Sequence, residues 1–166
     1  MKCKTHLKPS SVFCILYSVF CILTFNSFAG FDYNPRCQQA MQAALDLRID
    51  DARRLVGQEL AQNPDNGYAV YLDYYTDAIA LIITENEEWY EELIDRHDER
   101  MDRLAALDDG SPYSKWLQAE MLFHTGLAQI KFGSRFNGAT KMISSYLKIK
   151  DHRHKYPHFW QNEKLT

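Results

Sequence analysis

The sequence has few cysteines, and their positions do not suit a disulfide framework. Of its four cysteines, Cys3, Cys14 and Cys21 lie within residues 1–29, and Cys37 is alone in the rest of the chain. If residues 1–29 are removed, no disulfide can form within the chain. Cys37 lies at helical spacing with small apolar residues, so we expect it to be buried as a small hydrophobic side chain.

The sequence also lacks the short motifs that hold phosphate, activate a serine or bind zinc on a helix. It has no surplus of basic residues either, because 19 Lys and Arg stand against 22 Asp and Glu. Without residues 1–29, which contain three lysines and no acidic residue, the balance is more acidic still. This composition argues against a general nucleic-acid-binding protein, and we expect no cofactor.

Residues 1–29 have the pattern of an export signal. Residues 12–25 are almost wholly apolar, and Ser27-Phe28-Ala29 places small residues at the two positions that a signal peptidase reads. The positive charges before the apolar run are Lys2, Lys4 and Lys8. The pattern predicts an exported protein of the periplasm or cell envelope whose mature chain begins at Gly30.

An uncleaved membrane anchor is the alternative for this segment, because residues 11–28 approach the roughly 18 to 20 apolar residues that cross a bilayer. We favour cleavage because of the small residues and because Asn26 weakens a membrane span. Lipid attachment at Cys14 or Cys21 is not expected, since a phenylalanine precedes each of them.

The rest of the chain shows helical periodicity throughout, with no segment that reads as a strand. Caps, prolines and glycines predict six helices, which begin at about residues 35, 51, 68, 87, 112 and 135. The fourth should run unbroken to Asp109-Gly110, and the sixth should end near Ile149. The apolar face of the predicted fourth helix includes His97, and the apolar face of the predicted fifth helix includes His124. In the sixth, the residues expected to be buried are Phe136, Ala139, Ile143, Tyr146 and Leu147.

Short loops between these helices predict antiparallel hairpins, and the first hairpin partly matches a tetratricopeptide repeat. The match consists of Ala40, Ala52, Val56 and Pro64, whereas the consensus aromatic and leucine positions hold Arg36, Gln39 and Ala43. The predicted fold class is therefore all-α, with hairpins over residues 30–150 stacked as a short, degenerate, tetratricopeptide-like right-handed solenoid. Residues 151–166 form a basic and aromatic tail.

Three short segments resemble the opening of large exported bacterial tetratricopeptide-like proteins of uncharacterised role. They are residues 31–36 (Phe-Asp-Tyr-Asn-Pro-Arg), 131–133 (Lys-Phe-Gly) and 156–159 (Tyr-Pro-His-Phe). In those proteins the chain continues well beyond this point. The resemblance therefore implies that residues 151–166 are a junction to further repeats, with partly exposed aromatic rings. It supplies no catalytic residue.

Aromatic side chains are the best candidates for binding a partner. Tyrosine offers amphipathic contact area at low entropic cost, although packing between hairpins explains most of the tyrosines of the third helix, which include Tyr74. The candidate partner-binding residues are Tyr68, Tyr71, Tyr75, Tyr156, Phe159 and Trp160.

Two other groups of side chains could carry chemistry, and both have a simpler explanation. His152, His154 and His158 could share a metal ion, but Asp151 is the only other ligand type nearby, which favours a solvated loop. Paired carboxylates on the fourth helix could act as acid and base. Their spacing relative to Arg96, Arg100 and Arg103 instead predicts ion pairs on a solvated helix.

These observations favour a non-enzymatic interaction scaffold in the cell envelope that binds a protein or peptide, with no nucleic acid and with membrane contact only if residues 11–28 remain attached. The alternative is an envelope enzyme or metal-binding protein that uses the C-terminal histidines or the acidic helix.

Overall fold

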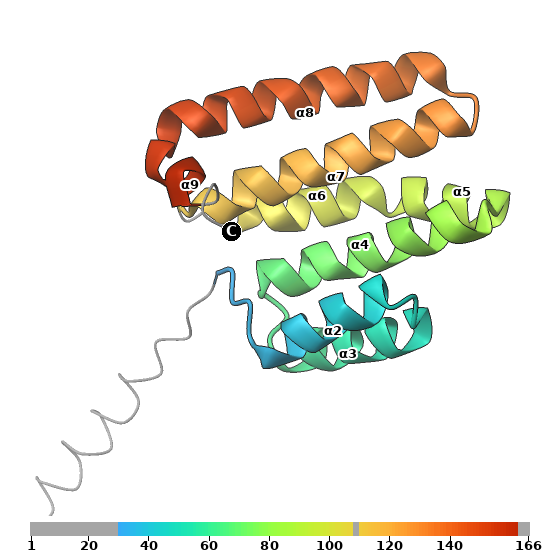
Figure 1. The fold of residues 1–166 in the computed structure, drawn as a ribbon, viewed down its shortest axis with the longest axis horizontal. Helices are drawn as coiled ribbons and strands as arrows, with labels where there is room; N and C mark the ends of the chain where they lie inside the picture. The colour runs from blue at the N-terminus through green and yellow to red at the C-terminus, as the bar shows by residue number, and fades with distance from the viewer. Residues whose placement is uncertain (1–29, 108–109, 163–166) are drawn as a thin grey trace, which may run out of the picture.

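The computed structural model describes residues 30–107 and 110–162, and every regular element in these ranges is a helix (Figure 1). The predicted all-α class is confirmed. The predicted export signal lies outside the described residues, and no described helix is long and apolar enough to cross a membrane. The helices are α2 (Pro35–Leu45), α3 (Ile49–Gln62), α4 (Gly67–Thr84), α5 (Glu87–Asp95), α6 (His97–Ala106), α7 (Pro112–Lys131), α8 (Arg135–Lys155) and α9 (Pro157–Asn162).

Side-chain caps begin several of these helices where the sequence predicts them. The side chains of Asn34, Asn86 and Ser111 each accept hydrogen bonds from backbone N–H groups of the first turn of α2, α5 and α7. The second helix begins two residues before its predicted start and has no side-chain cap. Helix α3 begins at Ile49, because Leu47 adopts a positive φ of 63° and the chain turns there.

Small residues bring α2 and α3 together, as the repeat pattern predicts. Ala43, Ala44 and Ala52 are fully buried against one another, and Cys37 packs with Val56 in the adjoining cluster. The expected burial of Cys37 is thus confirmed, and burial raises the pKa of its thiol to about 11.

Replacing Ala52 by leucine should therefore overpack this hairpin and lower the free energy of unfolding by about 1–3 kcal/mol. Urea denaturation of the Ala52→Leu variant measures the effect. Ala61→Leu, on an exposed position of the same helix, serves as the matched control and should change the stability little. Equal stabilities for the two variants would contradict the close contact of α2 with α3.

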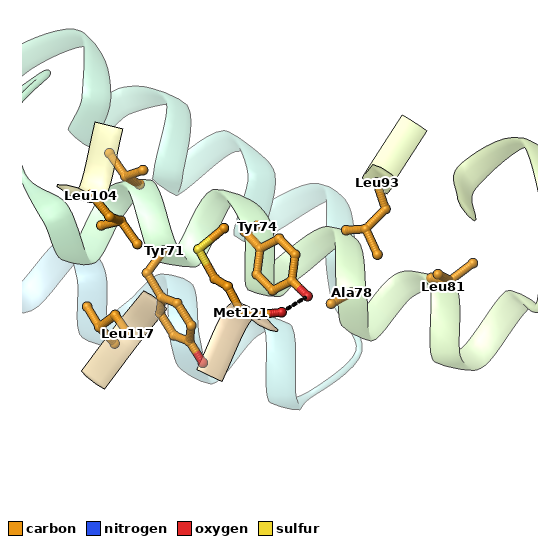
Figure 2. Packing of buried hydrophobic residues seen from close by; sticks show 9 residues of the cluster. Tyr71, Tyr74, Ala78, Leu81, Leu93, Leu104, Leu117 and Met121 are labelled. Atoms are coloured by element: carbon orange, nitrogen blue, oxygen red, sulfur yellow. Dashed lines mark hydrogen bonds between the residues drawn. The ribbon is translucent and has the colours of Figure 1, made fainter. Parts of the chain in front are cut away.

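The main core lies where α4 meets α7, with α5 and α6 covering its side (Figure 2). Tyr74 is fully buried there, and its hydroxyl donates to the backbone oxygen of Met121 at 3.1 Å. Leu104 and Leu117 close one end of this core, whereas Ala78, Leu81 and Leu93 lie at the other.

The predicted fourth helix is divided at Arg96 into α5 and α6, and Arg100 of α6 is buried. Arg100 is 1% exposed and pairs with Asp73 and Asp77 of α4, which Arg96 also contacts. The prediction of a solvated helix with its own surface ion pairs is wrong for Arg100, whereas Arg96 also pairs with Glu92, four residues earlier, at 3.7 Å. The charges of both arginines serve the contact with α4, because α4 places two carboxylates one helical turn apart on the facing side.

Glycines permit an unusually close approach of α7 to α8. A Cβ atom built on Gly138 would lie 2.5 Å from the backbone oxygen of Gly126, and one built on Gly126 would lie 2.8 Å from that of Gly138. The covered face of α8 is the stripe of Gly138, Ser145 and His152, and the last two contact backbone oxygens of α7.

Helix α8 lies at the outer edge of the fold (Figure 1), and its large apolar residues face solvent. The prediction that they are buried is wrong: Phe136 is 84% exposed, and the other members of the set are also exposed. They are Ala139, Ile143, Tyr146 and Leu147. The periodicity identified an apolar face correctly but could not tell that the opposite, glycine-bearing face meets the neighbouring helix.

Helix α8 extends to Lys155, six residues beyond the expected end at Ile149, because nothing before Pro157 interrupts it. Helix α9 then folds back against the beginning of α7, where the Phe159 ring contacts Tyr113 and Trp116. The Tyr156 hydroxyl donates to the backbone oxygen of Gly110 at 2.6 Å.

Candidate functional site

An apolar pocket opens between α4, α5 and α7. Its floor consists of three buried side chains, Ala78 and Leu81 from α4 and Leu93 from α5, which belong to the end of the core seen in Figure 2. Ala128 of α7 forms part of its wall. The volume is about 180 Å³, close to that of engineered apolar cavities of about 150 Å³ that bind benzene. The pocket can therefore hold one apolar group of the size of a leucine or phenylalanine side chain.

The mouth of the pocket is apolar and accessible. Ile82 is 62% exposed and Leu127 is 43% exposed, and both line the pocket from opposite helices. Phe132, which stacks on Tyr90 with ring centroids 4.5 Å apart, forms part of the lining. At the edge, the Lys131 ammonium group pairs with the Glu85 carboxylate at 2.7 Å. An incoming apolar group would thus meet apolar walls first and one ion pair at the rim.

His124 is a polar residue in the wall of the pocket. Its Nδ1 atom is buried and has no hydrogen-bond partner among the described residues, and burial lowers the pKa of its imidazole. The ring lies between Tyr75 and Phe123, with centroid distances of 5.9 and 5.7 Å. A neutral imidazole in this position can exchange a hydrogen bond with a polar atom at the base of a bound group.

The candidate tyrosines of α4 are divided between the core and this region. Tyr71 is buried and stacks on Tyr75 at 5.6 Å, and Tyr74 lies wholly inside the core. Tyr75 is half-buried and contacts His124, so it is the one candidate that reaches the pocket wall. Tyr68 packs elsewhere, against Tyr113 at 5.4 Å.

The remaining candidates form a row of aromatic rings at one end of the fold. Tyr113 lies between Tyr68 and Phe159, since its ring centroid is 5.4 Å from one and 5.5 Å from the other. Phe159 in turn contacts Trp160. The tail rings are half-buried, and this row holds α9 against the beginnings of α4 and α7, at a distance from the pocket in the chain and in the fold.

The three C-terminal histidines are not brought together. His152 is buried; its Nδ1 atom accepts a hydrogen bond from Trp160 at 2.9 Å, and its Nε2 atom contacts the backbone oxygen of Pro112 at 2.7 Å. Both of its nitrogens are therefore used within the protein, whereas His154 is exposed. No group of three or more metal-ligating side chains occurs in residues 30–107 and 110–162.

The residues that build the pocket had no individual signal in the sequence. Leu93, Leu127 and Ala128 fall on apolar lines typical of core positions, and His124 falls on the same line as Ala128. Only the arrangement of α5 relative to α7 leaves a space between them. In comparisons with protein families, curated proteins and solved structures, no family model, no protein and no structure matches this chain.

Proposed function

We propose that this protein is a non-enzymatic interaction scaffold that binds a protein or peptide by taking one apolar side chain into the pocket between α4, α5 and α7. The observation that carries the proposal is the pocket itself, a cavity of about 180 Å³ with a buried floor and an exposed apolar mouth. Exposed apolar surface on a soluble domain marks a site of association more often than a site of chemistry.

The expected occupant is a leucine or aromatic side chain of an extended or helical peptide segment. Burying such a side chain contributes about 1.5–3 kcal/mol, and anchor residues of this kind dominate many interfaces. The Lys131–Glu85 pair at the rim and the His124 ring offer polar contacts to the backbone of the same segment. The described residues that line the pocket include no set of acid, base and nucleophile, which is why we propose binding and not catalysis.

The order of helix contacts supports the proposed tetratricopeptide-like stack. The first helices of successive hairpins, α2, α4 and α7, contact one another in sequence, and α3 and α6 each contact the first helix of the next hairpin. In such a stack the first helices line one surface, and ligands bind there. We also propose that the hairpins form a right-handed solenoid and that the protein is exported to the cell envelope. We further propose that it is related to the exported bacterial tetratricopeptide-like proteins.

Small amides that carry a single side chain test the pocket directly. We expect N-acetyl-L-phenylalaninamide and N-acetyl-L-leucinamide to shift the NMR signals of Leu81, Leu127 and His124 in a saturable manner. N-acetyl-L-asparaginamide should not do so. The Ala128→Phe variant, which fills the pocket from its own wall, should weaken binding of the phenylalanine probe by about tenfold or more, since the binding energy of one buried side chain is lost.

Ala105→Phe is the matched control, because Ala105 is exposed on α6 and does not line the pocket. This variant should bind the probes as the unchanged protein does. Equal responses to the phenylalanine and asparagine probes, or undiminished binding by a folded Ala128→Phe protein, would overturn the proposal.

A further inference from the structure

A second cavity, of about 400 Å³, lies between α6 and α8 with α7 behind it. It differs from the apolar pocket in being lined largely by polar side chains. His97 and Asp98 come from α6, Gln129 from α7, and Lys141 from α8. Phe136, whose ring is 84% exposed, forms one wall.

A hydrogen-bond network in the core occupies one ring nitrogen of His97. The Tyr74 hydroxyl contacts both the backbone oxygen of Met121, at 3.1 Å, and the Thr125 hydroxyl, at 2.9 Å. The Thr125 hydroxyl in turn lies 3.0 Å from His97 Nδ1. The other ring nitrogen, Nε2, has no hydrogen-bond partner among the described residues.

Gln129 supplies a second polar atom without a hydrogen-bond partner in the lining of the same cavity. It lies one helical turn after Thr125 on the same face of α7, and its side chain lines the cavity. The residue is 6% exposed, and its Oε1 atom is buried without a hydrogen-bond partner. Leaving such an atom unpaired is unfavourable, and this cost disappears if a bound molecule donates a hydrogen bond to it.

The charges around the cavity offset one another. Lys141 contributes one ammonium group and Asp98 one carboxylate, and the two deep groups, His97 and Gln129, are neutral. Burial, with a smaller contribution from Lys141, lowers the pKa of His97 to about 4, so its imidazole is uncharged at neutral pH. Thr140 donates to the backbone oxygen of Phe136 and thus presents its own lone pairs. The cavity therefore offers several acceptors, one strong donor and an aromatic surface, without a net charge to select an ion.

We propose that this cavity binds a small neutral polyhydroxy compound, a monosaccharide or a sugar unit of a larger glycan. One hydroxyl group of the sugar forms a hydrogen bond with His97 Nε2, a neighbouring hydroxyl group donates to Gln129 Oε1, and one of the two accepts from Lys141 Nζ. A hydroxyl group both donates and accepts, so it suits this mixture of partners better than a carboxylate or an amine does. The apolar face of the sugar ring lies against Phe136. This inference is independent of the apolar pocket, which is separate in position and in chemistry.

Binding of D-glucose, D-galactose and N-acetyl-D-glucosamine to the purified protein, followed by NMR, tests the proposal. We expect saturable shifts of the Gln129 side-chain amide and the His97 ring for at least one of these sugars, and none for L-alanine or for sodium glucuronate. Gln129→Leu should weaken sugar binding by about tenfold or more, because one hydrogen bond to a buried partner is lost. Phe136→Ala should also weaken sugar binding. Because Phe136 is exposed, this substitution should leave the protein folded.

Stability measurements separate a ligand site from a merely structural role. Replacing a buried, unpaired oxygen by an apolar group of similar shape is neutral or stabilising, so Gln129→Leu should keep or raise the melting temperature while it loses the sugar. Gln58→Leu, at an exposed position of α3, is the control and should bind normally. If none of the three sugars shifts the Gln129 and His97 signals at saturating concentration, the cavity holds water only and the proposal is wrong. Equal binding by the Gln129→Leu protein would also overturn it.

Discussion

Replacing Arg100 by alanine is expected to destabilise the fold by about 3–5 kcal/mol, the cost of removing one partner from a buried ion pair. Arg100 is 1% exposed and contacts both Asp73, at 2.9 Å, and Asp77 of α4. Without its guanidinium group, Arg96 remains as a more exposed partner of these two carboxylates. Urea denaturation of the Arg100→Ala variant measures the loss.

The control for this variant is Arg103→Ala on the same helix. Arg103 donates to the backbone oxygen of Pro64 at 3.1 Å at the surface, so its removal should cost no more than about 1 kcal/mol. Comparable losses for the two arginines would show that α6 does not depend on the ion pairs with α4. A loss confined to Arg100 supports the inward orientation of this helix.

The second large effect is a loss of stability at acidic pH, which we attribute to the buried imidazole of His97. The folded protein holds the pKa of His97 at about 4, chiefly through burial, and Lys141 and Arg100 act in the same direction while Asp98 opposes them. An unfolded histidine has a pKa of about 6.5. The unfolded chain therefore binds more protons than the folded chain between about pH 6.5 and 4, and stability falls as the pH falls through this window.

The pKa difference of His97 corresponds to about 3 kcal/mol at the acidic end of the window. The variant His97→Gln should remove this part of the pH dependence, so the difference in unfolding free energy between pH 7 and about pH 4.5 becomes smaller than in the unchanged protein. Burial also lowers the pKa values of His124 and His152, so their contributions to the pH dependence of stability remain in this variant. His154→Gln, at an exposed position, is the control. An unchanged pH dependence in His97→Gln would contradict the burial of this imidazole.

The sequence predicted the helices well where a local signal marks their ends. Asn34, Asn86 and Ser111 each combine a capping side chain with a suitable first turn, and the structure uses all three. The pairing of α2 with α3 also followed from local residues, because the alanines that permit it repeat at helical spacing. The first prediction depends on contacts within one turn of a helix, and the second on two helices that are adjacent in the chain.

Features that depend on the relation between distant helices could not be predicted in this way. The partners of Arg100 lie on α4, more than 20 residues earlier in the chain, so its charge pattern resembled that of an ordinary solvated helix. The contact of Gly126 with Gly138 decides which face of α8 is covered, and a glycine in a helical pattern is an ambiguous signal. His97 and His124 fell on apolar lines, but the two cavities beside them arise only from the spacing of α5, α6 and α8 around α7.

The central claim is that the apolar pocket anchors a peptide, and selection from a random dodecapeptide library displayed on phage tests it most directly. Purified protein containing residues 30–166 serves as the bait, and the Ala128→Phe protein serves for counter-selection. We expect enriched peptides that share one leucine, phenylalanine or tryptophan and that lose about tenfold or more in affinity when that residue becomes alanine or when Ala128 becomes phenylalanine. Peptides without a common apolar residue, or peptides that bind the Ala128→Phe protein equally well, would contradict the account.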